Sequence, residues 1–570
     1  MEEVTVQPRD GEPGGGVGGA AAPGGWRGAR VLLGILVVCY CVYAGVFIYR
    51  TSFVISGRRC FCLFDDAMVS MRYAANLAHG QGLVWNPGGE RVEGFTNPLW
   101  VVFMSLFHLL PISDYMTSLA IQISGGLFAL MAALYARGVA RALSAGSELA
   151  GLSAAVLTAF YLPLVSWSIQ GTEVSVLALL VAAAAYLMVR SLGRGEFSVA
   201  AYGLLGVAVL VRLDAAVLLV TVMLFGMMAD GQHRWRHARW GAVALAVGAG
   251  SQTLFRMVYY GDALPNTYYL KMTGYPTALR ALRGLICFAG FALLAPWWLL
   301  GLGLSGVVWR RDRRRLLLGA LFCAQCAYSV YVGGDGWEWW GGANRYVAIV
   351  MPLLLALVAV SVAEAVGWAE KELGESPKAL RYAMRGGGVA VVLGCLVASN
   401  SFSPTSLREW VLVELPLHQK DNALNVRTAE LLRAVTTEKA LVAVSWAGAI
   451  PYFSHRRSFD LLGKCDRRIA HEQVHVPEGW TGVSLFIPGH LKWDFEYSMV
   501  KAGPDITLRD VSRGPKEIEF FMKHYRSFYL GEHEVYVKIG SPNVRWEELY
   551  RVDAAERERR WGPKRPGVGG

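Results

Sequence analysis

Residues 62–76 read CLFDDAMVSMRYAAN and follow the first long apolar segment of the chain. The pattern predicts a helix that begins at the paired aspartates. At about 100° per residue, Asp65 and Arg72 share one helix face, whereas Asp66 and Tyr73 share the adjacent one. The positive end of a helix favours ionised carboxylates. Such groups can take a proton, act as nucleophiles or hold a divalent cation, and a simple helix cap is the alternative interpretation.

Composition indicates an integral membrane protein. The chain has 570 residues, of which 54% are hydrophobic and only 17% are charged, and this is too apolar for an ordinary soluble enzyme. Its 19 Trp and 24 Tyr suit the two interfacial belts of a membrane protein. The net charge of +11 comes from short basic clusters between apolar segments, which are typical of cytoplasmic loops rather than of nucleic-acid binding.

The apolar segments predict a polytopic α-helical protein with about 11 transmembrane helices. They lie near residues 31–49, 115–136, 149–166, 173–189, 197–211, 215–229, 239–258, 284–304, 316–332, 346–367 and 386–402. The apolar segment 98–111 is short for a span of about 20 residues, so we expect an interfacial helix there. With that choice the Arg- and Lys-rich loops all fall on one side, which the positive-inside rule identifies as the cytoplasm. The N-terminus is then inside and the C-terminal region outside.

Composition also divides the chain into regions. We expect a disordered cytoplasmic tail at 1–29, a transmembrane domain at 30–402 with its first outer loop at 50–114, an extracytoplasmic α/β domain at 403–550 and a flexible tail at 551–570. In the α/β domain, short apolar runs predict strands at 440–446, 483–487 and 534–539, and a helix at 424–435.

The predicted outer face carries most of the unusual polar residues. In the first outer loop, turns at Pro-Gly-Gly and Glu-Gly would bring polar side chains back over the aspartates. The candidate binding residues in that loop are Arg72, Asn86, Glu93 and Asn97, and the next outer loop adds Glu173.

Later segments add further candidates. Arg212 and Asp214 interrupt an apolar hairpin, where charges are costly unless they serve a cavity. Mutual pairing of the two in a tight turn explains them equally well. The next outer loop combines amide, phenol and ammonium groups in Asn266, Tyr268 and Lys271. Lys271 could hold a phosphate, although a lysine that reaches back to the interface is the commoner explanation.

Residues 333–345 read GGDGWEWWGGANR and combine tryptophans with acids and an arginine. Aromatic faces flanked by hydrogen-bonding groups suit sugar rings. An interfacial belt explains the tryptophans equally well, but not Asp335 and Arg345. The outer region adds His490 and Asp494. A lone histidine is more often structural than catalytic, and no Ser-His-Asp order suggests a hydrolase.

The first outer loop contains an ordered set of motifs: Asp65-Asp66, Arg72-Tyr73, Asn76-Leu77, Gly82-Leu83-Val84-Trp85-Asn86-Pro87-Gly88 and Val92-Glu93-Gly94-Phe95-Thr96-Asn97-Pro98-Leu99-Trp100. This order resembles the opening of bacterial GT-C membrane glycosyltransferases, and in particular the mycobacterial terminal β-(1→2)-arabinofuranosyltransferase group. The stretches 264–271, 332–335 with Arg345, and 488–490 with Asp494 are also similar to that group. The chain departs from it where Arg212-Leu213-Asp214 replaces Arg-Pro-Asp.

The resemblance implies a polyprenyl-phosphate sugar donor, an extracytoplasmic cell-envelope glycan as acceptor, and a place in the bacterial cytoplasmic membrane; arabinofuranose is the sugar it suggests. Asp65 or Asp66 would then take the acceptor proton. Arg345 and Lys271 would stabilise the leaving phosphate, with Arg212 as a further candidate. Glu93, Asn86 and Asn97 would orient sugar hydroxyls. The sequence leaves the split between the two aspartates and any role of a divalent cation open.

Two other classes of protein share some of these features. A secondary transporter also has many helices and intramembrane charges. The sequence shows no internal repeat at half-length, and its polar groups gather on one face rather than at the midplane. A non-catalytic glycan-binding or assembly protein could use the outer domain alone.

Overall fold

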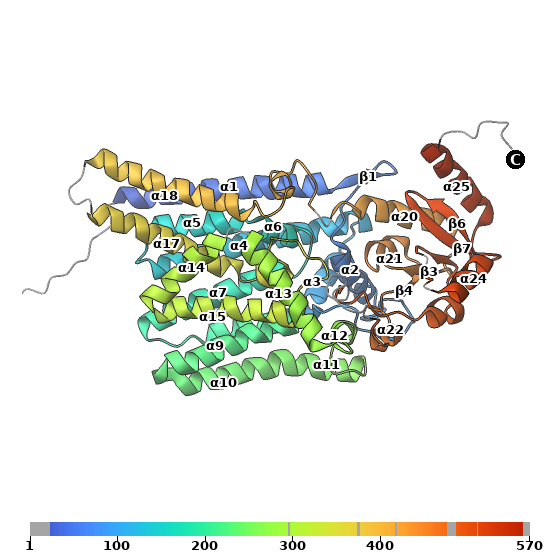
Figure 1. Ribbon diagram of the computed structural model, residues 1–570, viewed down its shortest axis with the longest axis horizontal. Helices are drawn as coiled ribbons and strands as arrows, with labels where there is room; N and C mark the ends of the chain where they lie inside the picture. The colour runs from blue at the N-terminus through green and yellow to red at the C-terminus, as the bar shows by residue number, and fades with distance from the viewer. Residues whose placement is uncertain are drawn as a thin grey trace, which may run out of the picture.

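The computed structural model describes residues 23–561, apart from 295–296, 373–376, 417–418, 476–485, 510 and 513. Long helices fill one end of the molecule and a smaller α/β domain fills the other (Figure 1). Two helices of the first outer loop, α2 (Asp65–Ala78) and α3 (Pro98–His108), lie between these two parts. The predicted helix that begins at the paired aspartates is thus present, at the junction.

The helical end is built from elements of very different length. Their bounds are α1 Pro23–Thr51, α4 Asp114–Leu143, α5 Glu148–Ala159, α6 Leu162–Ile169, α7 Val174–Arg194, α8 Val199–Val211, η1 Leu213–Ala215, α9 Ala216–Ala229, η2 Gly231–His233, α10 Arg234–Leu245, η3 Ala246–Gly250, α11 Ser251–Tyr259, α13 Thr277–Leu294, α14 Trp297–Arg310, α15 Arg313–Tyr331, α17 Met351–Glu372 and α18 Lys378–Ser399.

Among the described residues, six helices are long and apolar enough to cross a membrane, and eight if each of two bent helix pairs counts as one span. Length and apolarity therefore single out fewer spans than the 11 predicted. One reason is that the predicted helix 284–304 is divided between α13 and α14. Another is that α8 has only 13 residues. The short segment 98–111 forms α3, which has 11 residues.

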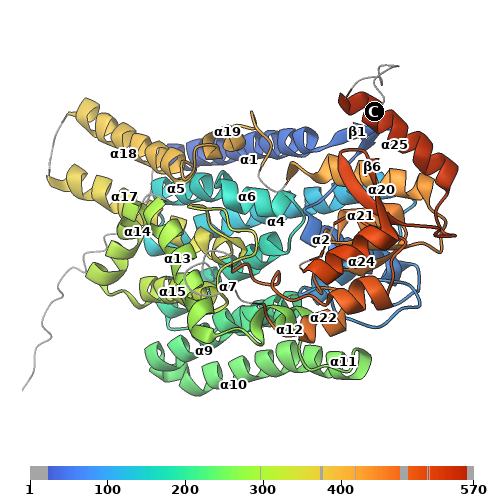
Figure 2. The ribbon, with the colours of Figure 1, turned by 45° about the vertical axis from the view of Figure 1, so that its right-hand side comes forward.

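Burial separates the central helices from those at the edge. In α17, residues 351–360 are all buried, and the small residues of α4 and α7 let these helices pack closely around it. By contrast, α1 and α18 expose most of their apolar side chains, as expected for helices that face lipid. Figure 2 shows both of these helices along one side of the bundle.

Short elements join the bundle to the outer domain. The hairpin β1 Phe53–Ile55 and β2 Arg58–Cys60 precedes α2, whereas α12 Asn266–Met272 and α16 Arg345–Ala348 come from later outer loops. In α16 the side chain of Asn344 caps the helix by accepting from the backbone N–H groups of Tyr346 and Val347. This cap fixes the start of the helix that carries Arg345.

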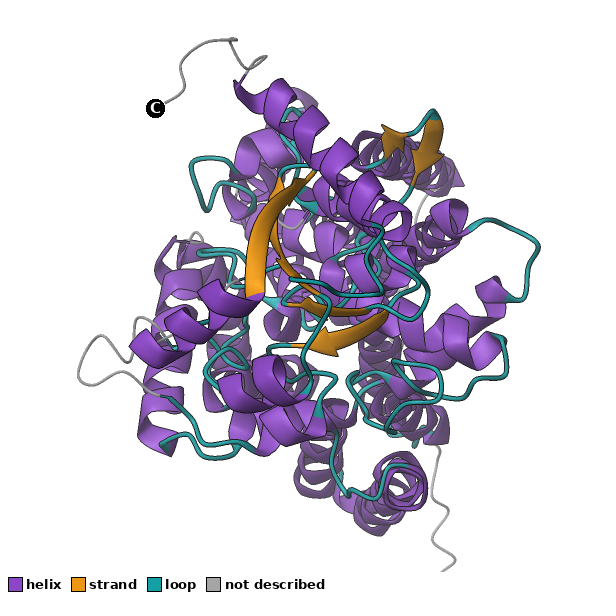
Figure 3. Cartoon of the chain, turned by 90° about the vertical axis from the view of Figure 1, so that its right-hand side faces the viewer, coloured by secondary structure: helices purple, strands orange, loops and turns teal. Residues whose placement is uncertain are grey.

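The outer domain is a five-stranded mixed sheet with helices around it (Figure 3). The strand order is β4-β3-β5-β7-β6; β3 pairs in parallel with β4 and β5, and β7 pairs antiparallel with β5 and β6. The bounds are α19 Ser406–Trp410, α20 Asn422–Val435, β3 Leu441–Val444, α21 Ala449–Ser454, β4 Arg457–Asp460, α22 Arg467–His471, η5 Glu496–Lys501, β5 Ile506–Thr507, α24 Pro515–His524, β6 Tyr525–Leu530, β7 His533–Lys538 and α25 Trp546–Trp561.

The structure corrects several of the predicted elements. Residues 483–485 of one predicted strand lie outside the described residues, and 486–487 are not in a strand. The strands β4, β5 and β6 were not predicted at all. Residues 551–561 belong to α25, so they do not form the expected flexible tail, and 562–570 lie outside the described residues. Of the expected N-terminal tail, 1–22 lie outside the described residues and 23–29 begin α1.

Candidate functional site

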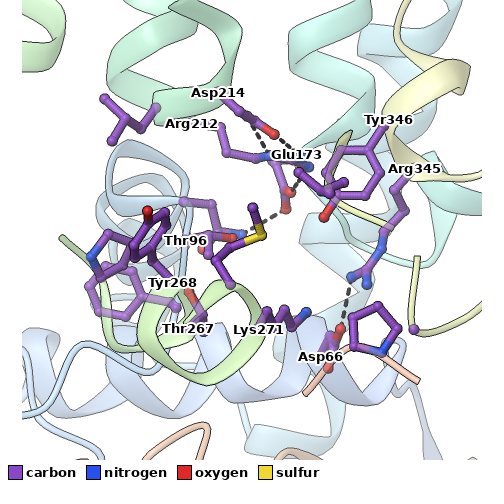
Figure 4. A pocket seen from close by; sticks show the side chains of 18 of the residues that line it. Asp66, Thr96, Glu173, Arg212, Asp214, Thr267, Tyr268, Lys271, Arg345 and Tyr346 are labelled. Carbon is purple, nitrogen blue, oxygen red and sulfur yellow. Dashed lines mark hydrogen bonds and ion pairs between the residues drawn. The ribbon is translucent and has the colours of Figure 1, made fainter. Parts of the chain in front are cut away.

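A cavity of about 330 Å³ lies at the junction of the helical bundle and the outer domain. Its wall combines polar and charged groups with an apolar side. The charged and polar lining residues include Asp66, Ser70, Thr96, Asn97, Glu173, Arg212, Asp214, Tyr268, Lys271, Arg345, Tyr346 and Lys464, and the apolar ones include Ala216, Val217, Leu264, Pro265, Met272 and Val332. Figure 4 shows the charged groups converging from several elements.

Asp66, in the first turn of α2, is held between two cations. Its Oδ2 accepts from Arg345 at 2.8 Å and its Oδ1 from Lys464 Nζ at 2.7 Å. Burial opposes ionisation, but Lys464, Arg345 and Lys271 together hold the pKa of Asp66 well below its ordinary value. The Asp66 side chain is therefore a carboxylate in the resting protein.

Arg345 connects Asp66 to a second acid. Its Nε and one terminal nitrogen donate to the two carboxylate oxygens of Asp335, at 2.7 and 2.6 Å, while the other terminal nitrogen donates to Asp66. The guanidinium also lies 5.6 and 5.5 Å from the ring centres of Phe64 and Trp167. Because Asp335 is only 1% exposed, this bidentate pair fixes the arginine in one orientation.

Lys271 is a cation in the cavity wall whose ammonium group has no partner among the described residues. In the described part of the chain it has no hydrogen bond or ion pair, and its side chain points from α12 toward Asp66 (Figure 4). Burial lowers the pKa of Lys271 to about 8, and the neighbouring Asp66 opposes that effect. Lys271, Lys464 and Arg345 outnumber Asp66 and Asp335, so this end of the cavity suits an anion such as phosphate.

The opposite wall holds a second charged network. Arg212 pairs with Glu173 at 2.8 Å and also with Asp214, and its guanidinium lies 4.8 Å from the ring centre of Tyr346. Asn97 donates to Glu173 at 2.7 Å. The predicted pairing of Arg212 with Asp214 is thus present, and both residues also line the cavity.

Asp65, the residue before Asp66 on α2, does not line this cavity. Its Oδ1 accepts from the backbone N–H of Ala449 at 2.8 Å, and its Oδ2 from that of Gly448 at 3.2 Å. Burial raises the pKa of Asp65 to about 6, and these two donors oppose the shift. The two predicted catalytic aspartates therefore have different surroundings: Asp65 ties α2 to the outer domain, whereas only Asp66 lines the large cavity.

Replacing Gly448 by alanine is expected to loosen this tie. A β-carbon at Gly448 would overlap the Asp65 carbonyl oxygen and lie 2.8 Å from its carboxylate. We expect a loss of about 1–3 kcal/mol in the free energy of unfolding, measured as a lower Tm. Gly514→Ala is the matched control, because a β-carbon there meets no atom within 4 Å. Equal Tm values for the two variants would contradict this role of Gly448.

Several predicted binding residues do not line the large cavity. Arg72 donates to the backbone carbonyls of Trp85, Pro451 and Arg456, and to the side chain of Asn86. The Asn86 amide in turn bonds Ser458 on β4. These two residues hold the outer domain against α2 and do not line the cavity, so the structure gives them a structural role.

Three more predicted residues are engaged elsewhere. Glu93 forms a buried ion pair with Arg256 at 2.6 Å. Asp494 pairs with Arg468 at 2.8 Å and accepts from the backbone N–H of Tyr497 in η5. The Asn266 side chain donates to backbone carbonyls of the outer domain. None of the three lines either cavity described here.

His490 lines a smaller cavity of about 60 Å³ beside the first. Asp66, Lys271 and Lys464 contribute to both cavities, and Asp65, Trp337, Trp446 and Asp460 line only the smaller one. Burial lowers the pKa of His490, so its imidazole is neutral at pH 7. Asp66 thus stands between two spaces, one large and one small.

Lys464 is the main site residue that the sequence did not indicate. It follows β4 in the outer domain, 398 positions after Asp66. It has the amino-acid type of a phosphate ligand but no motif around it. Only its approach to the aspartates in the folded chain marks it.

The charges around Asp66 also affect how well the paired aspartates could bind a divalent cation. In the described residues no group of three or more His, Cys, Asp and Glu side chains is arranged to hold a metal ion. Both oxygens of Asp66 face cations, and both oxygens of Asp65 face backbone N–H groups. The donor set at the paired aspartates therefore fits a cationic ligand poorly.

Comparison with solved structures gives matches over nearly the whole chain. ArnT from Cupriavidus metallidurans bound to undecaprenyl phosphate matches with a TM-score of 0.54 at 15% identity, covering 91% of this chain and 99% of that one. The oligosaccharyltransferase of Archaeoglobus fulgidus in the apo form matches with a TM-score of 0.53 at 14% identity, covering 92% and 77%. The chain has the GT-C fold.

Three further findings add little about activity. Archaeal AglB from Archaeoglobus fulgidus, in complex with an inhibitory peptide and a dolichol-phosphate, matches this chain with a TM-score of 0.51 at 12% identity, covering 94% and 78%. Residues 416–549 match a family described as a domain of unknown function (DUF8728). No curated protein sequence matches the chain. At these identities the structural matches show the fold alone.

Proposed function

We propose that the protein is an integral-membrane glycosyltransferase that moves a sugar from a polyprenyl-phosphate donor to an extracytoplasmic glycan. The main observation that supports this proposal is the large cavity. There the carboxylate of Asp66 lies beside Lys271, which has no hydrogen bond or ion pair among the described residues, and next to an apolar wall. An apolar wall suits a polyprenyl chain, and the cationic end suits its phosphate. The GT-C fold shared with ArnT bound to undecaprenyl phosphate and with AglB in complex with a dolichol-phosphate supports the lipid donor.

In this proposal the acceptor hydroxyl loses its proton to the Asp66 carboxylate as its oxygen attacks the anomeric carbon of the donor sugar. The bond between that carbon and the phosphate oxygen breaks, and polyprenyl phosphate leaves with the bonding electrons. Lys271 and Arg345 stabilise the charge that develops on the phosphate. Asn97, Glu173 and Tyr268 line the cavity and would orient the sugar.

The arrangement of the chain supports an outward-facing site. Helix α15 runs from Arg313 at one end of the bundle to Tyr331 at the cavity. Its basic end therefore lies away from the site, as the positive-inside rule expects for a site outside the cytoplasm. The first residues of α1 lie at the bundle end opposite the outer domain (Figure 1). We infer a bacterial cytoplasmic-membrane protein with its N-terminus inside and its outer domain outside.

The test is transfer by the purified protein in lipid nanodiscs. Polyprenyl-phosphoryl arabinofuranose is the first donor, with a short synthetic arabinoside as acceptor, because the motifs of the first outer loop resemble arabinofuranosyltransferases. A hexose-linked donor runs in parallel, and a chelator arm tests a divalent cation. We expect a glycosylated product from one donor. No product from any lipid-linked sugar, with lipid phosphate failing to bind, would contradict the proposal.

A further inference from the structure

The segment 460–466, hereafter the 460–466 loop, reaches from the end of β4 to the cavity. Its shape is fixed internally, because the Asp460 carboxylate accepts from the backbone N–H groups of Leu462 at 3.0 Å and Cys465 at 2.7 Å. Gly463 has a φ of +78°, a left-handed conformation that a glycine adopts without strain. The loop therefore has a defined conformation, in which Lys464, the residue after Gly463, reaches the cavity.

A side chain from the helical bundle holds this loop in place. The Nδ2 of Asn266, the first residue of α12, donates to the backbone carbonyls of Gly463, Lys464 and Asp466 at 3.0, 3.0 and 3.2 Å. The same helix carries Lys271, five residues further on. Asn266 therefore links the loop that carries Lys464 to the helix that carries Lys271.

The three cations of the site differ in how many ion pairs they form. Arg345 donates to both Asp335 and Asp66, and a rigid bidentate pair fixes it. Among the described residues, the only ion pair of Lys464 is with Asp66, and its four-carbon stem leaves its ammonium group free to move. Lys464 lines both cavities, as Lys271 does. An anion beside Lys271 would thus have a second lysine within reach.

We propose that Lys464 blocks Asp66 in the resting protein and moves to the lipid phosphate when the donor binds. This inference rests on the proposed function. A phosphate attracts an ammonium group at least as strongly as a carboxylate does, and two lysines would then bind it. Oδ1 of Asp66 becomes free to accept the acceptor's hydroxyl proton, whereas Oδ2 stays with Arg345. The donor therefore binds before the acceptor can react.

The first measurement is binding of undecaprenyl phosphate to the full-length protein. Lys464→Met removes the charge and is expected to weaken binding about 10- to 100-fold, the effect of one charge-assisted hydrogen bond. Lys464→Arg keeps the charge and is expected to restore most of the affinity. Lys439→Met is the matched control, because Lys439 is an exposed lysine of the same domain away from both cavities.

The second measurement separates this role from a structural one. Asp66 is faced by Arg345, Lys271, Lys464, Asp335, Asp65 and His490. Removing Lys464 removes one of the cations that keep Asp66 ionised, so its pKa rises. The acid side of the pH profile of kcat/KM for the donor, which reports the free enzyme, is then expected at higher pH in Lys464→Met, but not in Lys464→Arg or in Lys439→Met.

The outcomes distinguish the two proposals. If Lys464→Met binds lipid phosphate like wild type and keeps the wild-type pH profile, the inference is wrong while wild-type transfer still supports the glycosyltransferase. If wild type neither binds the lipid nor transfers sugar, the proposed function fails. Should Lys464→Met not fold, Asn266→Ala tests the same idea: releasing the loop is expected to weaken lipid binding, and unchanged binding would overturn the role of the loop.

Discussion

Asp66→Asn is expected to reduce sugar transfer by about 10²- to 10⁴-fold, the usual contribution of a positioned base, while the protein stays folded. The substitution keeps the shape of the side chain but removes its charge and its ability to take a proton. Arg345 keeps its bidentate partner Asp335, whereas Lys464 loses its ion pair and keeps at most a hydrogen bond to the amide oxygen. The affinity for lipid phosphate is expected to be unchanged or higher, because the site loses a negative charge.

Asp65→Asn is the matched control for that variant. An amide at this position can accept from only one of the two backbone N–H groups of Gly448 and Ala449, and its NH₂ opposes the other. We therefore expect a lower Tm, from a loss of about 1–3 kcal/mol, with the remaining folded protein still active. If Asp65→Asn abolished transfer and Asp66→Asn did not, the roles of the two aspartates would be reversed.

The sequence was informative about the site where charge is costly. Asp66, Glu173, Arg212 and Arg345 lie in or beside apolar helices, and the structure brings them to one cavity. A charged residue next to the membrane must find a partner or a cavity, so its position alone is a strong signal. Their catalytic and binding roles stay predictions.

The sequence was less informative where tertiary contacts decide. Neighbouring residues on a helix point about 100° apart, and only the docking of the outer domain determines that Asp65 meets Gly448 while Asp66 meets the cavity. The contribution of Lys464 depends on a loop that Asn266 holds across the domain boundary. No periodicity or local motif encodes such a contact.

In the outer domain, secondary structure could also be predicted only in part from the sequence. Helix α20 and strands β3 and β7 occur where apolar periodicity predicts them. Strand β5 has only two residues, and β4 begins with an exposed arginine, so neither carries a recognisable pattern. Segments β4 and β5 become strands because they pair with β3. A short stretch of sequence does not encode such pairing between distant segments.

Arg345→Met is expected to affect stability and activity together. It leaves the carboxylate of Asp335, which is 1% exposed, without its cation. Breaking one side of such a buried pair costs about 3–5 kcal/mol, which a thermal unfolding curve would show as a large fall in Tm. Transfer by the folded fraction is expected to fall about 10²- to 10³-fold, because a donor to the charge that develops on the phosphate is lost.

The double variant Arg345→Met with Asp335→Asn separates the two effects. Asparagine removes the unpaired charge, so most of the lost stability is expected to return, whereas transfer stays low because the cation is still missing.

The pH dependence of stability gives a second check. Although burial opposes it, Arg345 holds the pKa of Asp335 below its ordinary value in wild type, so the stability from this pair is present at neutral pH and is lost only in strong acid. In Arg345→Met the unpaired carboxyl has a raised pKa, and the Tm deficit relative to wild type should shrink from pH 7 to pH 5. A deficit independent of pH, or transfer restored in the double variant, would contradict the place of Arg345 in the site.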